Sequence, residues 1–163
     1  SSSVMLPVKT EYAKSKLMAE EVVKDYAKIA RPFTVVGPGE PKEHLIPTLI
    51  RACLTGVEVP FVPDPIHDFV SADDCAKALW LIAKSGKNGE VYEIGTAIGK
   101  SNQDVLNAVQ EVTGIKIKTK LVKNLRSYDN KEWVCKSSKI RRLGWKPTKS
   151  LRDTILEMCA GYF

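Results

Sequence analysis

The chain has 163 residues, of which 44% are hydrophobic and 27% are charged, and its formal net charge is +6. This length and composition suffice for one domain with a buried core of ordinary size. No apolar run approaches the length of a membrane-spanning helix, and no charged-then-apolar segment opens the chain, so we expect no secretory signal and no membrane partner.

The spacing of the cysteines and the distribution of charge argue against two classes of function, metal binding and nucleic-acid binding. The four cysteines lie far apart and lack the paired spacing of a zinc site, so we expect reduced, buried thiols, no metal and a cytoplasmic location. Lysines and arginines are scattered, with denser stretches at 116–123 and 136–149 that also contain regularly spaced apolar residues. Solvated helix and strand faces explain this pattern, so nucleic acid is not an expected partner.

The first predicted element is a helix over 10–28, with Thr10 as its N-cap. Tyr12 and Lys16 are four residues apart, which places them on the same helix face. We expect both to face the protein, because they continue the edge of an apolar stripe made by Met18, Ala19, Val22, Val23 and Tyr26. A neighbouring ammonium favours the phenolate of a tyrosine, so the pair is a candidate proton donor; a chance pair on a solvated helix is the alternative.

The remaining elements alternate between strand and helix. Further helices are predicted at 45–54, 73–84, 102–113, from 138 and at 151–159, with Ser101 as an N-cap and Gly56 and Gly114 as terminators. The acidic pair Asp73-Asp74 suits the first turn of its helix, because carboxylates interact favourably with the helix dipole. Strands are predicted within 30–36 and at 57–62, 90–95 and 115–122, the last from its alternation of apolar residues with lysines.

Five motifs occur in chain order. The first is Tyr12-x-x-x-Lys16, which Ser1-Ser2-Ser3 precedes, and the other four are Ala30–Gly39 (ARPFTVVGPG), His67–Asp74 (HDFVSADD), Gly89–Thr96 (GEVYEIGT) and Leu143–Pro147 (LGWKP). Together they resemble the catalytic and C-terminal half of an extended short-chain dehydrogenase/reductase, the NAD-dependent epimerase/dehydratase family that acts on nucleotide sugars. The resemblance covers nearly the whole chain.

The resemblance implies an α/β fold. We expect part of a Rossmann-like doubly wound parallel sheet, interleaved with a smaller mixed α/β substrate-binding lobe. Residues 1–37 and 67–96 would be the remainder of the dinucleotide-binding domain, and residues 38–66 and 97–163 would mainly form the substrate-binding lobe.

The resemblance also implies a catalytic site and a cofactor. Ser3, Tyr12 and Lys16 match the catalytic residues of the family, in which the tyrosine transfers a proton while a hydride moves between the sugar and NAD or NADP. Tyr12 and Lys16, together with Pro32 and Phe33, are the expected cofactor contacts.

The expected substrate is a nucleotide-diphosphate sugar, bound by Ser3, Thr34, His67 and Arg126. The sequence departs from the family at two of these positions, because Thr34 stands where an asparagine is usual and His67 where an arginine is common. Lys136 likewise replaces an aspartate of an Asp-x-Ser/Thr-Lys signature. A second copy of the chain is also a candidate partner.

One expected feature of a dinucleotide fold is missing. A glycine-rich turn between a first strand and a helix, which would bind the pyrophosphate, does not occur in this sequence. We therefore expect segments of a longer enzyme, which could be an epimerase, dehydratase or reductase. A non-catalytic truncated family member that binds a nucleotide sugar or a protein partner stays open as the alternative.

Overall fold

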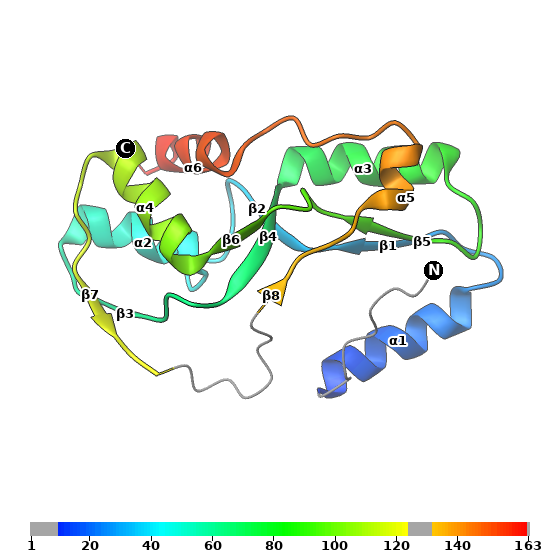
Figure 1. The fold of residues 1–163 in the computed structure, drawn as a ribbon, viewed down its shortest axis with the longest axis horizontal. Helices are drawn as coiled ribbons and strands as arrows, with labels where there is room; N and C mark the ends of the chain where they lie inside the picture. Colours follow the sequence, from blue (N-terminus) through cyan, green and yellow to red (C-terminus); the bar gives the residue numbers. More distant parts are fainter. Residues whose placement is uncertain (1–9, 124–131, 163) are drawn as a thin grey trace.

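Helices and strands alternate along the chain in the computed structural model, which describes residues 10–123 and 132–162 (Figure 1). The helices are α1 Glu11–Val23, α2 Leu45–Thr55, α3 Ala72–Ser85, α4 Asn102–Thr113, α5 Ser138–Arg142 and α6 Leu151–Ala160. The strands are β1 Ile29–Pro32, β2 Thr34–Val36, β3 Val59–Phe61, β4 Ile66–Ser71, β5 Val91–Ile94, β6 Gly99–Ser101, β7 Thr119–Leu121 and β8 Glu132–Trp133. The expected α/β class is confirmed.

Parallel pairing dominates the strand contacts. β1 pairs with β5, β2 with β4, and β3 with β7, each in parallel. β4 is the most connected strand, because it also pairs with β6 in antiparallel and with β8 in parallel. Parallel neighbours require crossover connections, which the helices between them supply. The parallel sheet expected from the resemblance is therefore present in these pairs.

Local sequence signals set the helix ends. The Ser101 hydroxyl oxygen accepts a hydrogen bond from the N–H of Asp104, and the Asp104 carboxylate accepts one from the N–H of Ser101, so this capping box fixes the start of α4. Gly56 and Gly114 end α2 and α4 in the left-handed region, at φ values of 67° and 69°. Thr10 caps α1 by accepting from the N–H of Ala13. These caps and terminators confirm the predictions.

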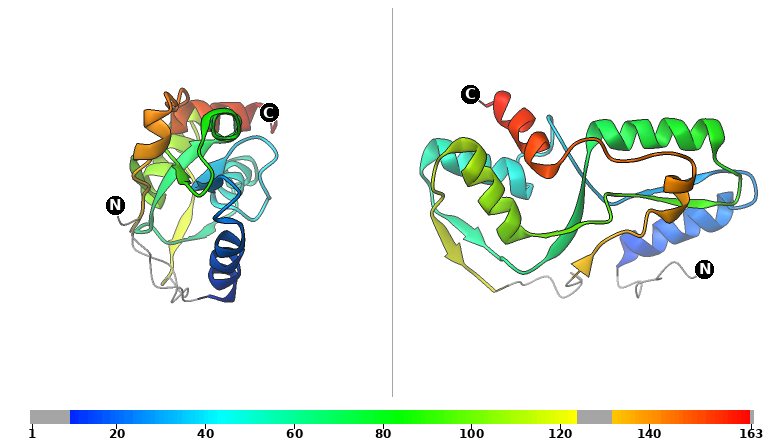
Figure 2. Two further views of the ribbon diagram at one scale, coloured as in Figure 1. Left: turned by 90° about the vertical axis from the view of Figure 1, so that its right-hand side faces the viewer. Right: turned by 45° about the horizontal axis from the view of Figure 1, so that its top comes forward.

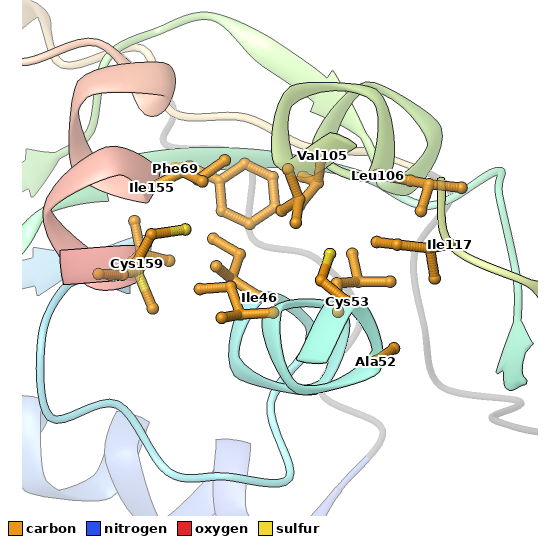
Figure 3. Close-up of a cluster of buried hydrophobic side chains, with 14 of the residues drawn as sticks. Ile46, Ala52, Cys53, Phe69, Val105, Leu106, Ile117, Ile155 and Cys159 are labelled. Atoms are coloured by element: carbon orange, nitrogen blue, oxygen red, sulfur yellow. The ribbon is translucent and has the colours of Figure 1, made fainter. Parts of the chain in front are cut away.

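The larger hydrophobic core, here called the lobe core, lies between α2, α4 and α6 (Figure 3). Figure 3 shows side chains of the three helices pointing toward one another, with Phe69 of β4 among them. Its fully buried members include Ile46, Leu49, Val105 and Ile155. Because burying such a side chain contributes about 1.5–3 kcal/mol, this cluster stabilises the helical lobe.

A second core, here called the sheet core, joins α3 and α5 to the ends of β4 and β5. Its buried members are Val70, Cys75, Ala78, Ile82, Tyr92, Ile94, Ile140 and Trp145. The last two come from the C-terminal part of the chain, far in sequence from the strands that they cover.

Asp74 ties the segment after α5 to the start of α3. Its fully buried carboxylate accepts hydrogen bonds from the N–H and hydroxyl of Thr148 and from the N–H of Lys149. The N-cap of α3 is Ser71, which accepts from the N–H of Asp74. The sequence predicted only a helix-end role for Asp74; its long-range role depends on residues more than 70 positions away, which local patterns do not reveal.

The predicted orientation of α1 is wrong. Most of the stripe that we expected to pack is solvent-facing, with Tyr12, Met18, Val22 and Tyr26 each more than 60% exposed. The half-buried face instead contains Ala13, Leu17, Glu20 and Val23. Figure 1 and the left view of Figure 2 show α1 and α3 on opposite sides of the β1–β5 pair. Two short strands offer little surface to a helix, so one narrow edge of α1 is covered.

The predicted strand over 115–122 is also shorter than expected. Within this segment, only β7 is paired as a strand, beginning opposite Val59. Before it, the N–H of Ile117 donates to the side-chain oxygen of Gln110, at 3.0 Å, and the Ile117 side chain enters the lobe core. Local contacts with α4 thus replace strand pairing in the first half of this segment.

Across the described residues, no helix is both long and apolar enough to cross a membrane. All four cysteines are buried free thiols, as expected.

Replacing Asp74 by asparagine should destabilise the protein by about 2–3 kcal/mol at pH 7, because a charged acceptor of several hydrogen bonds is lost. Burial raises the pKa of Asp74, but the hydrogen bonds from Thr148 and Lys149 outweigh it and lower the pKa to about 2. The stabilisation is therefore full above about pH 4 and disappears as pH falls toward 2. Urea unfolding of the wild type and Asp74→Asn from pH 2 to 7 tests this.

The exposed neighbour Asp73 provides a matched control, and Asp73→Asn should change stability far less. A stability difference between the wild type and Asp74→Asn that stays constant from pH 7 to 2 would contradict this account of the carboxylate.

Candidate functional site

Three strands bring a row of polar and aromatic side chains onto one face of the sheet. His67 of β4 is the register partner of Lys100 on β6 and of Trp133 on β8. Register partners project from the same face, so Lys100, His67 and Trp133 lie side by side across the sheet. Phe69, two residues after His67, shares this face and contacts the His67 ring edge-on, with the centroids 5.9 Å apart.

Thr34 and Phe33 reach the same region from the neighbouring chain segment. Thr34 is the register partner of Phe69 and is half-buried. Phe33 lies between β1 and β2, in the segment within which the sequence predicted one strand, and its N–H donates to the carbonyl of Ile94 at the end of β5. The Phe33 ring packs against that of Trp133, with centroids 5.5 Å apart and an interplanar angle of 41°. Three residues predicted for ligand binding, Phe33, Thr34 and His67, are therefore brought together.

Asp68 holds the opposite face of β4 in place. Its carboxylate is fully buried and accepts hydrogen bonds from the N–H and hydroxyl of Thr96, at 2.7 and 2.6 Å. It also accepts from the N–H of Ala97, at 2.8 Å, and of Cys135, at 3.3 Å. One side chain thus connects β4, the turn after β5 and the segment after β8, which fixes Trp133 beside His67.

Two neighbours of Asp68 are constrained by it. A Cβ atom at Gly95 would lie 2.6 Å from both an Asp68 oxygen and the Cys135 sulfur, so this position requires glycine. Burial and the adjacent Asp68 carboxylate raise the pKa of the Cys135 thiol to about 12, so it stays protonated at neutral pH. Cys135 is therefore a packing residue of this network and a poor nucleophile.

Tyr12 and Lys16 are adjacent on α1, as their spacing predicts. The Lys16 ammonium lies over the Tyr12 ring, 5.4 Å from its centroid. Both side chains are exposed, and within residues 10–123 and 132–162 neither polar end has a hydrogen-bond partner. The pair is thus formed and accessible, on a helix separate from the row at Lys100, His67 and Trp133.

One polar contact attaches α1 to β1. The Arg31 guanidinium donates from Nε to Glu20, at 2.8 Å, and a second time from its terminal nitrogen. A cleft of about 440 Å³ lies between α1 and the ends of β1 and β5, and Leu17, Met18, Ile29 and Val91 line its apolar part. Pro32, an expected cofactor contact, ends β1 and is exposed.

The other predicted site residues, Ser3 and Arg126, lie outside the described residues. Among the residues that the structure describes, no group of three or more histidine, cysteine or carboxylate side chains could hold a metal ion. Sequence reasoning missed Asp68, Lys100 and Trp133 at the site. A carboxylate inside an apolar strand was the available signal for Asp68, whereas the roles of Lys100 and Trp133 depend on strand register.

Comparison with known proteins gives one family. Residues 2–95 match the model of the NAD-dependent epimerase/dehydratase family. A dTDP-glucose 4,6-dehydratase of Salmonella typhimurium is 28% identical, over 99% of this chain and 52% of its own length. A UDP-glucose 4-epimerase of Lacticaseibacillus casei is 30% identical, over 90% of this chain and 53% of its own length.

A solved structure extends the likeness to the fold. DesIV, a dTDP-glucose 4,6-dehydratase from Streptomyces venezuelae crystallised as a double mutant with NAD bound, superposes with a TM-score of 0.83. It is 25% identical, and the match covers 93% of this chain and 50% of that chain. The chain spans about half the length of the curated relatives it matches.

Replacing Asp68 by asparagine should destabilise the protein by about 3 kcal/mol, because the amide group places N–H donors against backbone N–H donors that need an acceptor. It should also shift Trp133 fluorescence to longer wavelength, since the segment carrying Trp133 loses its anchor at Cys135. Urea unfolding and emission spectra test both effects.

The exposed residue Asp64 supplies the control for charge loss, and Asp64→Asn should leave both properties unchanged. Equal stability of Asp68→Asn and the wild type would show that the Asp68 network does not hold the site together.

Proposed function

Since the chain belongs to the NAD-dependent epimerase/dehydratase family, we propose that it provides the proton-transfer pair and the substrate-binding face of an enzyme acting on a nucleotide sugar. The observation that carries this proposal is the Tyr12–Lys16 pair, which lies within the family match and forms on one face of a capped helix. One relative is named as a dehydratase and another as an epimerase. The candidate net reactions are therefore epimerisation, dehydration and reduction.

The residues present fit the nicotinamide end of NAD or NADP. Lys16 offers an exposed ammonium for a ribose hydroxyl, and Pro32 and Phe33 offer apolar surface at the end of β1. When bound, the cofactor supplies redox chemistry by accepting and returning a hydride. A glycine-rich pyrophosphate-binding turn does not occur in this sequence, so only the nicotinamide half of a cofactor site is proposed for the chain.

Proton transfer is the task proposed for this chain's own residues. Tyr12 takes the proton of the reacting sugar hydroxyl and returns it, because a phenol beside an ammonium can exist as phenolate. Lys16 supplies that ammonium from the next helical turn. Ser3 is proposed to hold the sugar oxygen by a hydrogen bond.

The proposed substrate end of the site is the sheet face with Thr34 and His67. His67 can attract a diphosphate when protonated, and Thr34 offers a hydroxyl donor. Arg126 is proposed as a third phosphate ligand, with a planar guanidinium suited to bidentate contact. The buried, free thiols agree with a cytoplasmic enzyme.

A second candidate function is binding of a nucleotide sugar without turnover. The exposure of Tyr12, at 72%, favours it, because a proton-transfer residue works best in a site that excludes water. Titration of NADH with the purified protein separates the two functions. Enhanced NADH fluorescence supports the enzyme, whereas nucleotide binding without any response to NADH supports the second candidate.

Tyr12→Phe should lower turnover of a nucleotide sugar by about 10²–10⁴-fold, the usual effect of a positioned acid or base. Stability should change little, because the hydroxyl is exposed and unpaired within the described residues. Steady-state kinetics of the wild type and the variant measure the effect.

Tyr26→Phe is the matched control, since Tyr26 is another exposed tyrosine just beyond the same helix. Its turnover should equal that of the wild type. A Tyr12→Phe variant as active as Tyr26→Phe would remove Tyr12 from the mechanism.

A further inference from the structure

The outer face of α3 carries apolar side chains that no other described element covers. Trp80 is 72% exposed and Leu79 is 44% exposed, although large apolar side chains are mostly buried in folded proteins. Their spacing along the helix places them on one side together with the exposed alanines Ala72, Ala76 and Ala83. Figures 1 and 2 show α3 on the side of the β1–β5 pair opposite α1. An exposed apolar face that includes a tryptophan is typical of a protein–protein contact.

Charged side chains border this face along one flank of the helix. Asp73 lies in the first turn of α3, Lys77 in the middle and Lys84 in the last turn. Thr148 and Lys149 contact the start of this flank, but the Asp73 and Lys77 side chains keep 63% and 58% of their surface exposed. Among the residues that the structure describes, Lys84 makes no ion pair. The flank is therefore acidic at the start of the helix and basic at its end.

We propose that α3 is an interface with a second copy of the chain, in which the two α3 helices pack antiparallel about a two-fold axis. Such an axis brings the same flank of both helices to one side of the contact, so the acidic start of one helix meets the basic end of the other. The ends of opposite helix-dipole charge are then also neighbours. A parallel pair would instead place Asp73 against Asp73 and Lys84 against Lys84. The contact involves no residue of the proposed site, so it is independent of the proposed function.

One register suits both the charges and the tryptophan. If Asp73 lies opposite Lys84 of the second copy, the same two-fold axis places Lys77 opposite Trp80 of the second copy. That Trp80 ring can then pack on Ala76, whose small side chain lets the helices approach closely, and it lies within reach of the Lys77 ammonium for a cation–π contact. Each of these contacts occurs twice in a symmetric dimer. The face of α3 is therefore complementary to itself, which favours a second copy as its partner.

Sedimentation equilibrium tests whether the dimer forms. α3 has 14 residues and is about 21 Å long, so a single helix pair buries less surface than a standard interface. We expect a dissociation constant of about 10 µM, and the wild type should change from monomer to dimer between about 1 and 300 µM. A wild type that stays monomeric over this range would overturn the proposal.

Trp80→Ala tests the aromatic contact. The dissociation constant of the dimer should rise about thirtyfold, because a tryptophan buried at an interface commonly dominates the binding energy. Stability toward urea should change little, since Trp80 is exposed in the single chain. Tyr26→Ala, which removes an exposed aromatic ring next to α1, should dimerise like the wild type. A dimer that is weakened by Tyr26→Ala and not by Trp80→Ala would overturn the assignment to α3.

A mixing experiment tests the antiparallel register. Asp73→Lys and Lys84→Glu each place like charges opposite each other at both symmetric positions, so each variant alone should dimerise about tenfold more weakly. An equal mixture of the two should form a heterodimer about as tight as the wild-type dimer, because both charge pairs across the axis are then of opposite sign. Lys116→Glu makes the same charge change at an exposed lysine elsewhere and should dimerise like the wild type. A mixture that associates no better than the separate variants would overturn the proposed packing.

Failure of this inference differs from failure of the proposed function, because sedimentation measures mass and not turnover. Tyr12→Phe should dimerise like the wild type, since Tyr12 lies on α1 and outside the contact. A protein that dimerises through Trp80 but never turns over a nucleotide sugar would support the inference and refute the enzyme.

Discussion

The buried carboxylate of Asp68 is the interaction on which the site depends. Four donors from Thr96, Ala97 and Cys135 converge on it, so three chain segments that are distant in sequence take one arrangement. A buried carboxylate is tolerated only when its lone pairs are satisfied, and each donor therefore helps to fix the others. Because the Asp68 carboxylate holds both β4 and the segment after β8, the residues on the opposite face of β4 are also fixed. Trp133 is therefore kept in register with His67.

The two parts of the proposed site, the substrate face and the proton-transfer pair, are held in place by packing to different degrees. The substrate face stands between the lobe core and the sheet core, where buried side chains on both sides hold its strands. The proton-transfer pair stands on α1, which has no buried residue and is attached through Arg31 and one narrow apolar edge. Since a catalytic tyrosine must be held precisely, the affinity for nucleotide sugars is expected to depend less on the surroundings of α1 than turnover does.

Local features of the fold were predictable from sequence, and long-range ones were not. The bounds of α4 follow from Ser101 and Gly114, because capping and left-handed termination involve only neighbouring residues. The predicted packing direction of α1 was wrong, because the hydrophobic pattern of this helix is weak and the surface that it contacts is small. At the site, motif resemblance placed Phe33 and His67, which the structure brings together. Trp133 could be assigned to the site only from the strand register, which is set by hydrogen bonds to another strand.

Chemical-shift mapping by NMR tests the central claim most directly, because it locates a bound nucleotide without requiring turnover. Titration of the isotope-labelled chain with UDP should shift the amide signals of Thr34, His67 and Lys100 and the indole N–H signal of Trp133. The indole signal of buried Trp145, which donates to the Asp74 carbonyl, should stay in place. Shifts confined to α2, α4 and α6, with none along the row, would contradict the assignment of this sheet face as the substrate site.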